Sequence, residues 1–244
     1  METPVERAFP STEKTTKFSV YSHLPVQHVD KPVLGAEELS IFSTLYQPFP
    51  TSISASRSLT ERKAGGNVLT KNSKAGSLTY GEVVDMQLVQ EVLSILNEDG
   101  LLSSGNTDFF YDLGSGSGKM VIAAALTQTF QHCIGLEILT SLHDIASQVE
   151  QSYKQFLSQN ANGKIYSTVE FHQADILDLD AHDWTKAGCI YINSTCFDDS
   201  LMQRLMEIAT EHMRPGSIII TLSNFWAKKA VFEFIREIRH EMSW

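Results

Sequence analysis

The feature that most constrains this chain is a run of alternating glycines that follows a short apolar segment. Residues 109–113 predict a buried strand, glycines occupy three alternate positions from 114 to 118, and an apolar helix is predicted over 120–130. A glycine turn between a strand and a helix lets a ligand approach bare backbone at the carboxyl end of the strand. The sequence therefore predicts a cofactor site at this turn.

Two common glycine-rich loops do not fit this spacing. A phosphate-binding loop needs G-x-x-x-x-G-K-[ST], but Leu113 stands where the first glycine belongs and Met120 where Ser or Thr should bind magnesium. The dinucleotide fingerprint needs G-x-G-x-x-G, and here the third glycine comes one position early. Asp112, just before the turn, instead suits a cofactor with an α-ammonium group and no phosphates, because a carboxylate pairs with an ammonium. S-adenosylmethionine has these features.

Acidic residues also follow the next two predicted strands. Glu137 ends a strand predicted over 132–137, where the carboxylate of a doubly wound fold accepts hydrogen bonds from a ribose. Asp175 follows a strand predicted over 167–174, where its side chain and the Ile176 backbone are placed to hold an adenine. Taken alone, each acid is better explained as a cap at the end of a strand. The acids and the glycine turn together favour a cofactor site.

Strands alternate with helices through most of the chain. Further helices are predicted over 84–96, 139–157 and 201–213, and further strands over 189–193 and 217–222. This alternation predicts a doubly wound α/β sheet. The pattern of residues 231–244 fits a helix and one face of a strand equally, so periodicity leaves that stretch open.

The chain changes character near residue 77. Residues 1–76 are rich in Ser, Thr and Pro and hold nine Lys and Arg against seven Asp and Glu, whereas residues 77–244 hold ten against 22. We divide the chain into an N-terminal arm over 1–76, partly helical or disordered, and a main domain over 77–244. Within 51–77, five Lys and Arg residues stand against Glu61 alone, a pattern that fits either a solvated loop or a phosphate-binding role.

Several classes of function are excluded by composition and spacing. No apolar run approaches the ~20 residues of a membrane span, and the N-terminal residues lack the pattern of a secretory signal. The formal charge of −10 opposes a general nucleic-acid-binding role. The histidines lack metal-ligand spacing, and the acidic residues over 175–183 lack the glycine and glutamate of a calcium loop. We expect no membrane association, no metal site and a location in the cytosol or nucleus.

These motifs together resemble the Dot1-type histone H3 lysine methyltransferases, which are not SET-domain enzymes. The resemblance covers residues 79–244 and rests on Thr79-Tyr80-Gly81-Glu82, Asp112 to Gly118, Glu137, Ala174-Asp175-Ile176 with Trp184, and Ile190-Tyr191-Ile192-Asn193. It implies an α/β fold, the seven-stranded type of class I S-adenosylmethionine-dependent methyltransferase with a doubly wound, mostly parallel sheet. The chain stops at Ser243-Trp244, which resembles a family Ser-Trp before a final strand, so either the sequence is truncated at its last strand or that strand is missing together with a wall of the substrate channel.

The resemblance also implies roles for individual residues. The cofactor would be held by Tyr80, Gly81, Glu82, Val83, Asp112, Gly114, Gly116, Gly118, Lys119, Glu137, Asp175 and Ile176. Catalytic roles fall to Asn193 and Tyr80, and the substrate channel to Thr195 and Phe197. The family's usual Asn-Asn-Phe-x-Phe is here Asn193-Ser194-Thr195-Cys196-Phe197, so a threonine replaces one channel aromatic. From the residues alone, Asn193 is better explained as a cap of the following helix.

The implied activity is methylation of a lysine in the core of histone H3 on nucleosomes, in the nucleus, with S-adenosylmethionine as methyl donor. The basic stretch over 51–77 would then contact DNA or the nucleosome surface. Two alternatives stay open. One is an S-adenosylmethionine-binding regulatory or interaction domain of reduced activity. The other is a methyltransferase that acts on another protein or a small molecule.

Overall fold

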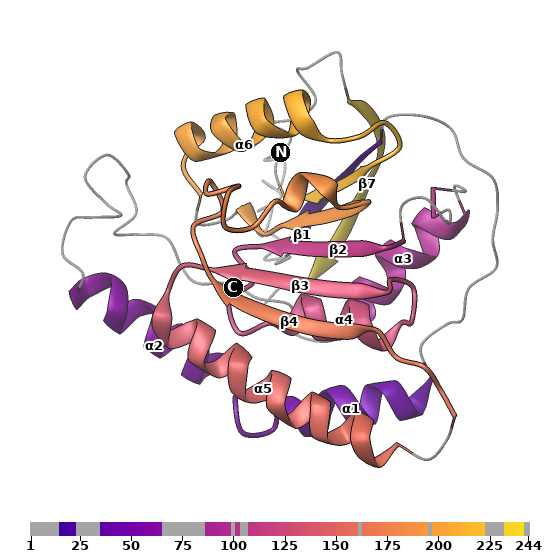
Figure 1. Ribbon diagram of the computed structural model, residues 1–244, viewed down its shortest axis with the longest axis vertical. Helices are drawn as coiled ribbons and strands as arrows, with labels where there is room; N and C mark the ends of the chain where they lie inside the picture. The colour runs from indigo at the N-terminus through magenta and orange to yellow at the C-terminus, as the bar shows by residue number, and fades with distance from the viewer. Residues whose placement is uncertain are drawn as a thin grey trace, which may run out of the picture.

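The computed structural model describes residues 15–22, 35–64, 86–98, 101–102, 107–160, 163–194, 197–222 and 232–241. Within these ranges one sheet of seven strands, in the order β4-β3-β2-β5-β6-β1-β7, forms the centre of the molecule (Figure 1). No helix in these ranges is both long and apolar enough to span a membrane.

Five parallel strands make up the middle and one side of the sheet. They are β2 (Phe109–Leu113), β3 (His132–Glu137), β4 (Thr168–Gln173), β5 (Cys189–Ile192) and β6 (Ile218–Thr221). The chain runs outward from β2 through β3 to β4 and then crosses back to β5 and β6 on the other side of β2. This order confirms the predicted doubly wound α/β sheet.

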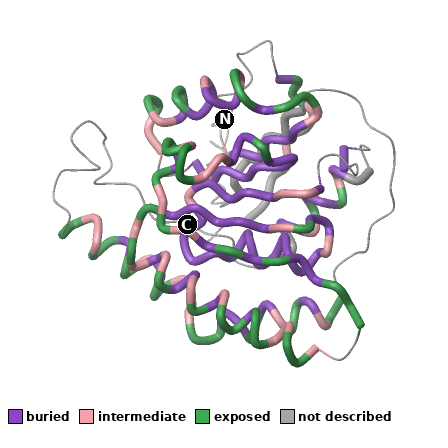
Figure 2. The backbone as a smooth tube through the Cα atoms, viewed as in Figure 1, coloured by how far each residue is buried: buried purple, intermediate pink, exposed green. Residues whose placement is uncertain are grey.

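Side chains of successive strand residues enter two separate apolar layers, as the two-residue period of a strand requires. Phe110 and Tyr191 pack on the side of α3 (Gln87–Glu98), α4 (Lys119–Leu126) and α5 (Thr140–Gln159). Leu113 and Ile192 pack on the side of α6 (Asp199–His212) and the short 3₁₀ helix η2 (Trp184–Lys186). Figure 2 shows β2, β3, β5 and β6 as mostly buried, which explains their nearly unbroken apolar sequences, whereas β4 alternates between exposed and buried residues.

The outer part of the sheet brings together two distant parts of the chain. The stretch whose periodicity was ambiguous contains a strand, β7 (Glu233–Glu241), which pairs antiparallel with β1 (Thr15–Ser22). β1 also pairs antiparallel with β6, so that Ser19 lies between Thr221 and Glu237 in the register. The sheet reaches seven strands because β1, from the segment assigned to the N-terminal arm, lies between β6 and β7.

Two helices of the N-terminal segment lie along α5 (Figure 1): α1 (Ala36–Tyr46) and α2 (Thr51–Ala64). Phe42 and Leu45 of α1 are buried in the layer on the α4 and α5 side. α2 contains the first half of the basic stretch, so residues 51–64 form a helix where a solvated loop was one expectation. The Ile53 amide donates to the Pro50 carbonyl, and the buried residues of α2 are the small Ser54 and Ser58.

Candidate active site

The site lies at the carboxyl ends of β2 and β5, the neighbouring strands from which the chain continues toward opposite sides of the sheet. These strands are parallel neighbours, with Leu113 opposite Ile192. Gly114 and Asn193, the next residue of each strand, therefore leave the sheet side by side. In open α/β sheets such a switch point forms the crevice in which ligands bind.

The glycine turn is fixed by backbone hydrogen bonds and by its neighbours. The amides of Gly114 and Ser115 both donate to the Leu136 carbonyl of β3, each at 2.9 Å. Gly114 and Gly118 have φ angles of +84° and +86°, a region that residues with side chains disfavour. A Cβ atom on Gly114 would also lie 2.9 Å from the Phe197 ring. The turn therefore requires glycine at these two positions.

Asp112 is buried in the middle of the sheet with an unpaired oxygen. It is 2% exposed and lies in register between Gly135 of β3 and Tyr191 of β5. Within the described part of the chain its Oδ1 has no hydrogen-bond partner. Burial raises the pKa of Asp112 well above its usual value, and the charge of Glu137 raises it further. An unpaired buried carboxylate is costly, so a cationic ligand group fits this position.

Glu137 joins the glycine turn to the start of α5. Its Oε2 accepts a hydrogen bond from the Gly116 amide and its Oε1 from the Leu139 amide, both at 2.8 Å. Burial raises the pKa of Glu137, and these hydrogen bonds offset the increase only in part. Since each carboxylate oxygen can accept more than one hydrogen bond, the group is still able to bind the two hydroxyls of a ribose.

Asp175 and Ile176 follow β4 in a tight turn. Asp175 is exposed, and its Oδ1 accepts from the Leu177 amide at 2.9 Å. Ile176 is buried, and its carbonyl accepts from the indole nitrogen of Trp184 at 2.7 Å. Trp184 thus fixes the backbone at the carboxyl end of β4, as expected of a packing residue. The contact of Asp175 and Ile176 with an adenine stays a prediction.

Asn193 is half-buried at the end of β5. The helix cap that was its simpler explanation is provided by Asp198, whose Oδ1 accepts from the Leu201 amide at 2.8 Å at the start of α6. Phe197 lies against the glycine turn. Asn193 is thus not the N-cap of α6, and its role toward a substrate lysine stays a prediction, as does the channel role of Phe197.

Other predicted residues have partners elsewhere or lie outside the described ranges. Lys119 is buried at the start of α4, its Nζ donates to Thr51 Oγ1 at 2.8 Å, and its ammonium lies 5.6 Å from the centre of the Tyr46 ring. The Lys119 ammonium is therefore directed to α1 and α2. Its part in cofactor binding remains a prediction. Tyr80, Gly81, Glu82, Val83 and Thr195 lie outside the described residues.

Sequence reasoning missed one residue beside the site, Glu61 of α2. Its Oε1 accepts from the Thr140 amide at 2.9 Å and its Oε2 from the Ser141 amide at 2.8 Å, at the start of α5. A weak signal existed, because the N-cap position of α5 is Leu139 and its first turn holds no acid. That signal shows that a capping group is lacking without indicating its source.

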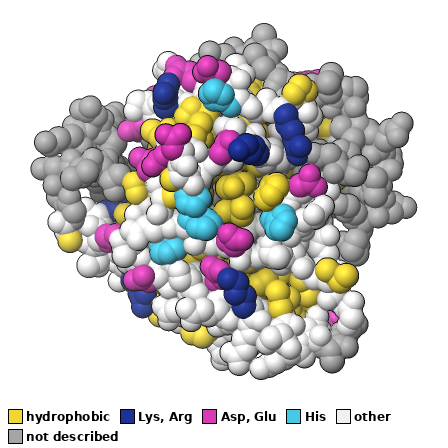
Figure 3. Space-filling model, viewed as in Figure 1, with side chains coloured by type: hydrophobic (Ala, Val, Ile, Leu, Met, Phe, Trp, Pro, Cys, Tyr) yellow, Lys and Arg dark blue, Asp and Glu magenta, His cyan; other side chains and the backbone are white. Residues whose placement is uncertain are grey.

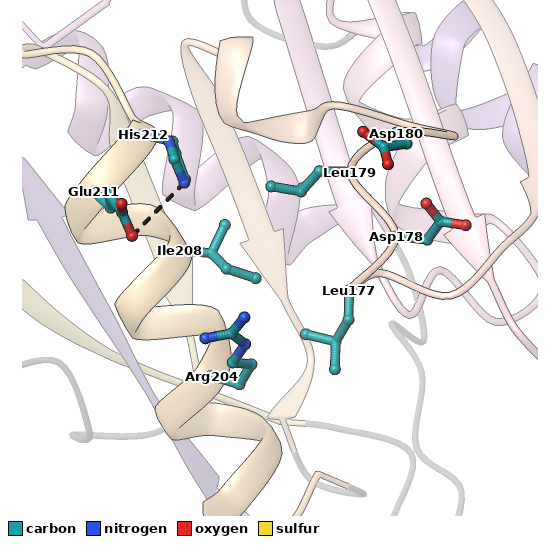
Figure 4. Close-up of a pocket in the computed structure, with 8 residues that line it drawn as sticks. All are labelled: Leu177, Asp178, Leu179, Asp180, Arg204, Ile208, Glu211 and His212. Carbon is teal, nitrogen blue, oxygen red and sulfur yellow. Dashed lines mark ion pairs between the residues drawn. The ribbon is translucent and has the colours of Figure 1, made fainter.

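A groove of about 250 Å³ lies between α6 and the loop after β4 (Figure 4). Its walls are Leu177, Asp178, Leu179, Asp180, Arg204, Ile208, Glu211 and His212. Nε2 of His212 lies 3.8 Å from Oε2 of Glu211. Of the predicted cofactor residues that the structure describes, none lines this groove.

Histidine side chains are scattered among acidic and basic ones on the face seen in Figure 3. His172 and His182 stack with ring centres 4.2 Å apart. In the described part of the chain, no three histidine, cysteine or acidic side chains are grouped so that they could hold a metal ion.

The doubly wound sheet, the glycine turn at its switch point and the acids that end β2 and β3 define a class I methyltransferase fold. The sequence matches the family described as "Histone methylation protein DOT1" over residues 63–241. The chain belongs to this family, which confirms the resemblance seen in its motifs.

Individual relatives carry names that agree with the family. A histone-lysine N-methyltransferase, H3 lysine-79 specific, of Caenorhabditis elegans is 30% identical over 160 residues, 65% of this chain and 16% of that protein. One of the same name from Candida albicans is 28% identical over 176 residues, 68% of this chain and 12% of that protein. The chain thus spans less than a fifth of either relative. A solved structure of a putative caffeoyl-CoA O-methyltransferase from Staphylococcus aureus is similar with a TM-score of 0.41 and 14% identity, over 67% of this chain and 72% of that one.

Proposed function

We propose that this protein transfers a methyl group from S-adenosylmethionine to a lysine in the core of histone H3 on nucleosomes, in the nucleus. The observation that carries the proposal is the buried Asp112 carboxylate, with its free Oδ1, beside the glycine turn at the switch point of the sheet. The family description and the names of the relatives support histone H3 as the substrate.

In this proposal the acids of β2 and β3 hold the amino-acid end and the ribose of the cofactor. Asp112 binds the α-ammonium through a charge-assisted hydrogen bond, which also relieves the cost of its burial. Glu137 binds the ribose while it continues to hold the Gly116 and Leu139 amides. When bound, S-adenosylmethionine supplies a methyl group on a positively charged sulfur.

Asn193 orients the substrate amine for the reaction. The cofactor would supply the methyl group from its sulfur to the lysine nitrogen, so the residues of this chain would have to hold that nitrogen in line with the methyl group. The amine must be neutral to react, although a lysine in water has a pKa of about 10.4. The proton therefore leaves for water as the lysine enters the channel. The Asn193 carbonyl oxygen can then accept from the neutral amine without itself taking up a proton.

The test of this proposal is transfer of a radioactive methyl group from labelled S-adenosylmethionine to reconstituted nucleosomes and to free H3. We expect nucleosomes to be much the better substrate, because a peptide lacks the folded surface that positions the lysine. Cofactor binding without methyl transfer to either substrate would favour the alternative function, a regulatory or interaction domain of reduced activity. Ser194, which stands in place of the family's second asparagine, leaves that alternative open.

We also propose that the basic residues over 51–77 contact DNA or the nucleosome surface. Arg57 and Lys63 are exposed on α2. Deleting the stretch would also remove Thr51 and Glu61, which contact Lys119 and α5, so the test must change charge alone.

Replacing Arg57, Lys63, Lys71 and Lys74 together by Gln is expected to lower activity on nucleosomes and to weaken its salt dependence. The slope of log affinity against log salt should fall by up to about 0.9 for each phosphate that the variant no longer neutralises. Nucleosome binding and methyl transfer are measured from low to physiological salt. Lys154→Gln with Lys186→Gln, which removes exposed cations elsewhere, is the control. An unchanged slope in the fourfold variant contradicts the proposed role of the basic residues.

A further inference from the structure

The helix α5 begins with no capping group of its own. Its N-cap residue is Leu139, and its first turn contains no acidic residue. The first amides of a helix have no partner within it, and a negative charge is favourable at that end. Here Glu61, from α2, supplies the hydrogen-bond acceptors and the negative charge. Its two carboxylate oxygens accept from the amides of Thr140 and Ser141 at 2.9 and 2.8 Å.

Glu61 and Glu137 together bind three consecutive amides. Glu137 binds the Leu139 amide, and Glu61 binds the next two, those of Thr140 and Ser141. The two carboxylates are close enough that the charge of Glu61 contributes to the raised pKa of Glu137. Burial alone would raise the pKa of Glu61, but the hydrogen bonds from Ser141 and Thr140 outweigh it and lower that pKa. Glu61 is therefore bound in its ionised form against the segment that orients Glu137.

The other end of α2 is also bound beside the glycine turn. Thr51, the first residue of α2, accepts from Nζ of Lys119, the first residue of α4, directly after Gly118. α2 thus contacts the starts of two helices: α4, which follows the glycine turn, and α5, which follows Glu137. Its buried residues are Ser54 and Ser58, so its docking buries few large apolar side chains. The polar contacts at its two ends are therefore important for its position.

We propose that Glu61 is a positioning residue for the cofactor site: it holds the start of α5 and thereby keeps Glu137 in the geometry that binds the ribose. The proposal rests on the proposed function, since it takes S-adenosylmethionine as the ligand of Glu137. Because Glu61 acts through Glu137, its loss changes cofactor binding and leaves the methyl-transfer step itself intact.

Glu61→Gln tests this role, because it removes the charge and keeps the size of the side chain. We expect the KM for S-adenosylmethionine and the Kd for S-adenosylhomocysteine to rise at least fivefold. The kcat at saturating cofactor and the KM for nucleosomes should stay within twofold of the wild-type values. A purely structural role would lower the melting temperature without this separation of KM from kcat.

Glu38→Gln is the matched control. Glu38 is a buried carboxylate that ties the N-terminal helix α1 to the main domain through Lys164 at 2.7 Å, and it also caps its own helix by accepting from the Gly35 amide at 2.9 Å. Lys164 precedes β4, at the opposite edge of the sheet from the glycine turn. This variant should lower the melting temperature while leaving the KM for S-adenosylmethionine unchanged. An equal rise of KM in both variants overturns the specific role of Glu61.

Further outcomes separate this inference from the function on which it rests. If the Glu61→Gln variant folds and binds S-adenosylhomocysteine as tightly as the wild type, the inference is overturned and the proposed function is not. Failure of the wild-type protein to bind S-adenosylhomocysteine overturns the function and the inference together. If Glu61→Gln does not fold, amide exchange of the wild type decides: the Thr140 and Ser141 amides should be protected, and more so with S-adenosylhomocysteine bound. Rapid exchange of both amides in the two states overturns the inference.

Discussion

Asp112→Asn is expected to weaken binding of S-adenosylmethionine about 10- to 150-fold while the protein stays folded. The substitution keeps the shape of the side chain and removes the negative charge that would pair with the α-ammonium. A hydrogen bond to a charged group contributes about 1.5–3 kcal/mol, which corresponds to this range of affinity. Titration calorimetry measures the loss directly.

The same substitution is expected to leave the melting temperature at neutral pH unchanged or higher. Burial raises the pKa of Asp112 in the folded protein, so the folded state holds this proton more tightly than the unfolded state. The contribution of Asp112 to stability is therefore greatest at low pH. It declines as the pH rises from the pKa of Asp in the unfolded protein, about 3.9, through the higher pKa of Asp112 in the folded protein. The Asp112→Asn variant should lack this decline of stability with pH. Calorimetric melting of both proteins at several pH values measures the difference.

Cofactor affinity should show the matching pH dependence. The wild-type protein binds the ammonium best with Asp112 ionised, so its affinity should fall as the pH is lowered through the raised pKa of Asp112. The Asp112→Asn variant should lack this fall. Asp144→Asn, which changes an exposed acid on α5, serves as the control and should bind the cofactor like the wild type. Unchanged affinity in Asp112→Asn would remove Asp112 from the site.

Asn193→Ala is expected to lower kcat by about 100-fold, the usual order of loss when a reacting group is misplaced. Its Kd for S-adenosylmethionine should stay within about twofold of the wild-type value, because the amide is assigned to the substrate amine and not to the adenosine. Single-turnover kinetics on nucleosomes, combined with equilibrium cofactor binding, separate the two quantities.

Ser194→Ala is the control for Asn193→Ala, since it changes the next residue of the same motif. Ser194 is buried, and its hydroxyl lies 3.5 Å from that of Thr221. The Ser194→Ala substitution should therefore lower stability more than it lowers kcat. A loss of cofactor affinity in Asn193→Ala with little change in kcat would assign Asn193 to the cofactor side of the crevice. In either case the N-cap of α6 stays with Asp198.

The sequence predicted the strands around the glycine turn well because they are buried on both faces. β2 and β3 match the predicted bounds, since each is a mostly apolar run and the first stops at the glycine turn and the second at Glu137. The helix expected over 120–130 ends earlier, at Leu126. The Thr127 hydroxyl donates to the Ala124 carbonyl at 2.6 Å, and Gln128 has a φ of +56°, so the helix stops where the sequence turns polar, at Thr127-Gln128-Thr129.

Features that depend on distant partners had at most a weak local signal. The 231–244 stretch fits either periodicity, and β7 forms within it by pairing with β1 from near the start of the chain. The role of Glu61 depends on the packing of α2 on α5, and the amides that it binds lie 79 and 80 residues further along the sequence. Asp112 and Glu137, in contrast, are recognisable because both stand at strand ends beside the glycine turn.

The most direct test of the proposed function is mass spectrometry of histone H3 after reconstituted nucleosomes are incubated with the protein and S-adenosylmethionine. The result expected is methylation of a single lysine in the folded core of H3, strongly reduced with Asp112→Asn and much weaker when free H3 replaces the nucleosome. Absence of methylated lysine in nucleosomal H3, or equal methylation of free H3 and nucleosomes, would contradict the assignment of this protein as a nucleosomal H3 lysine methyltransferase.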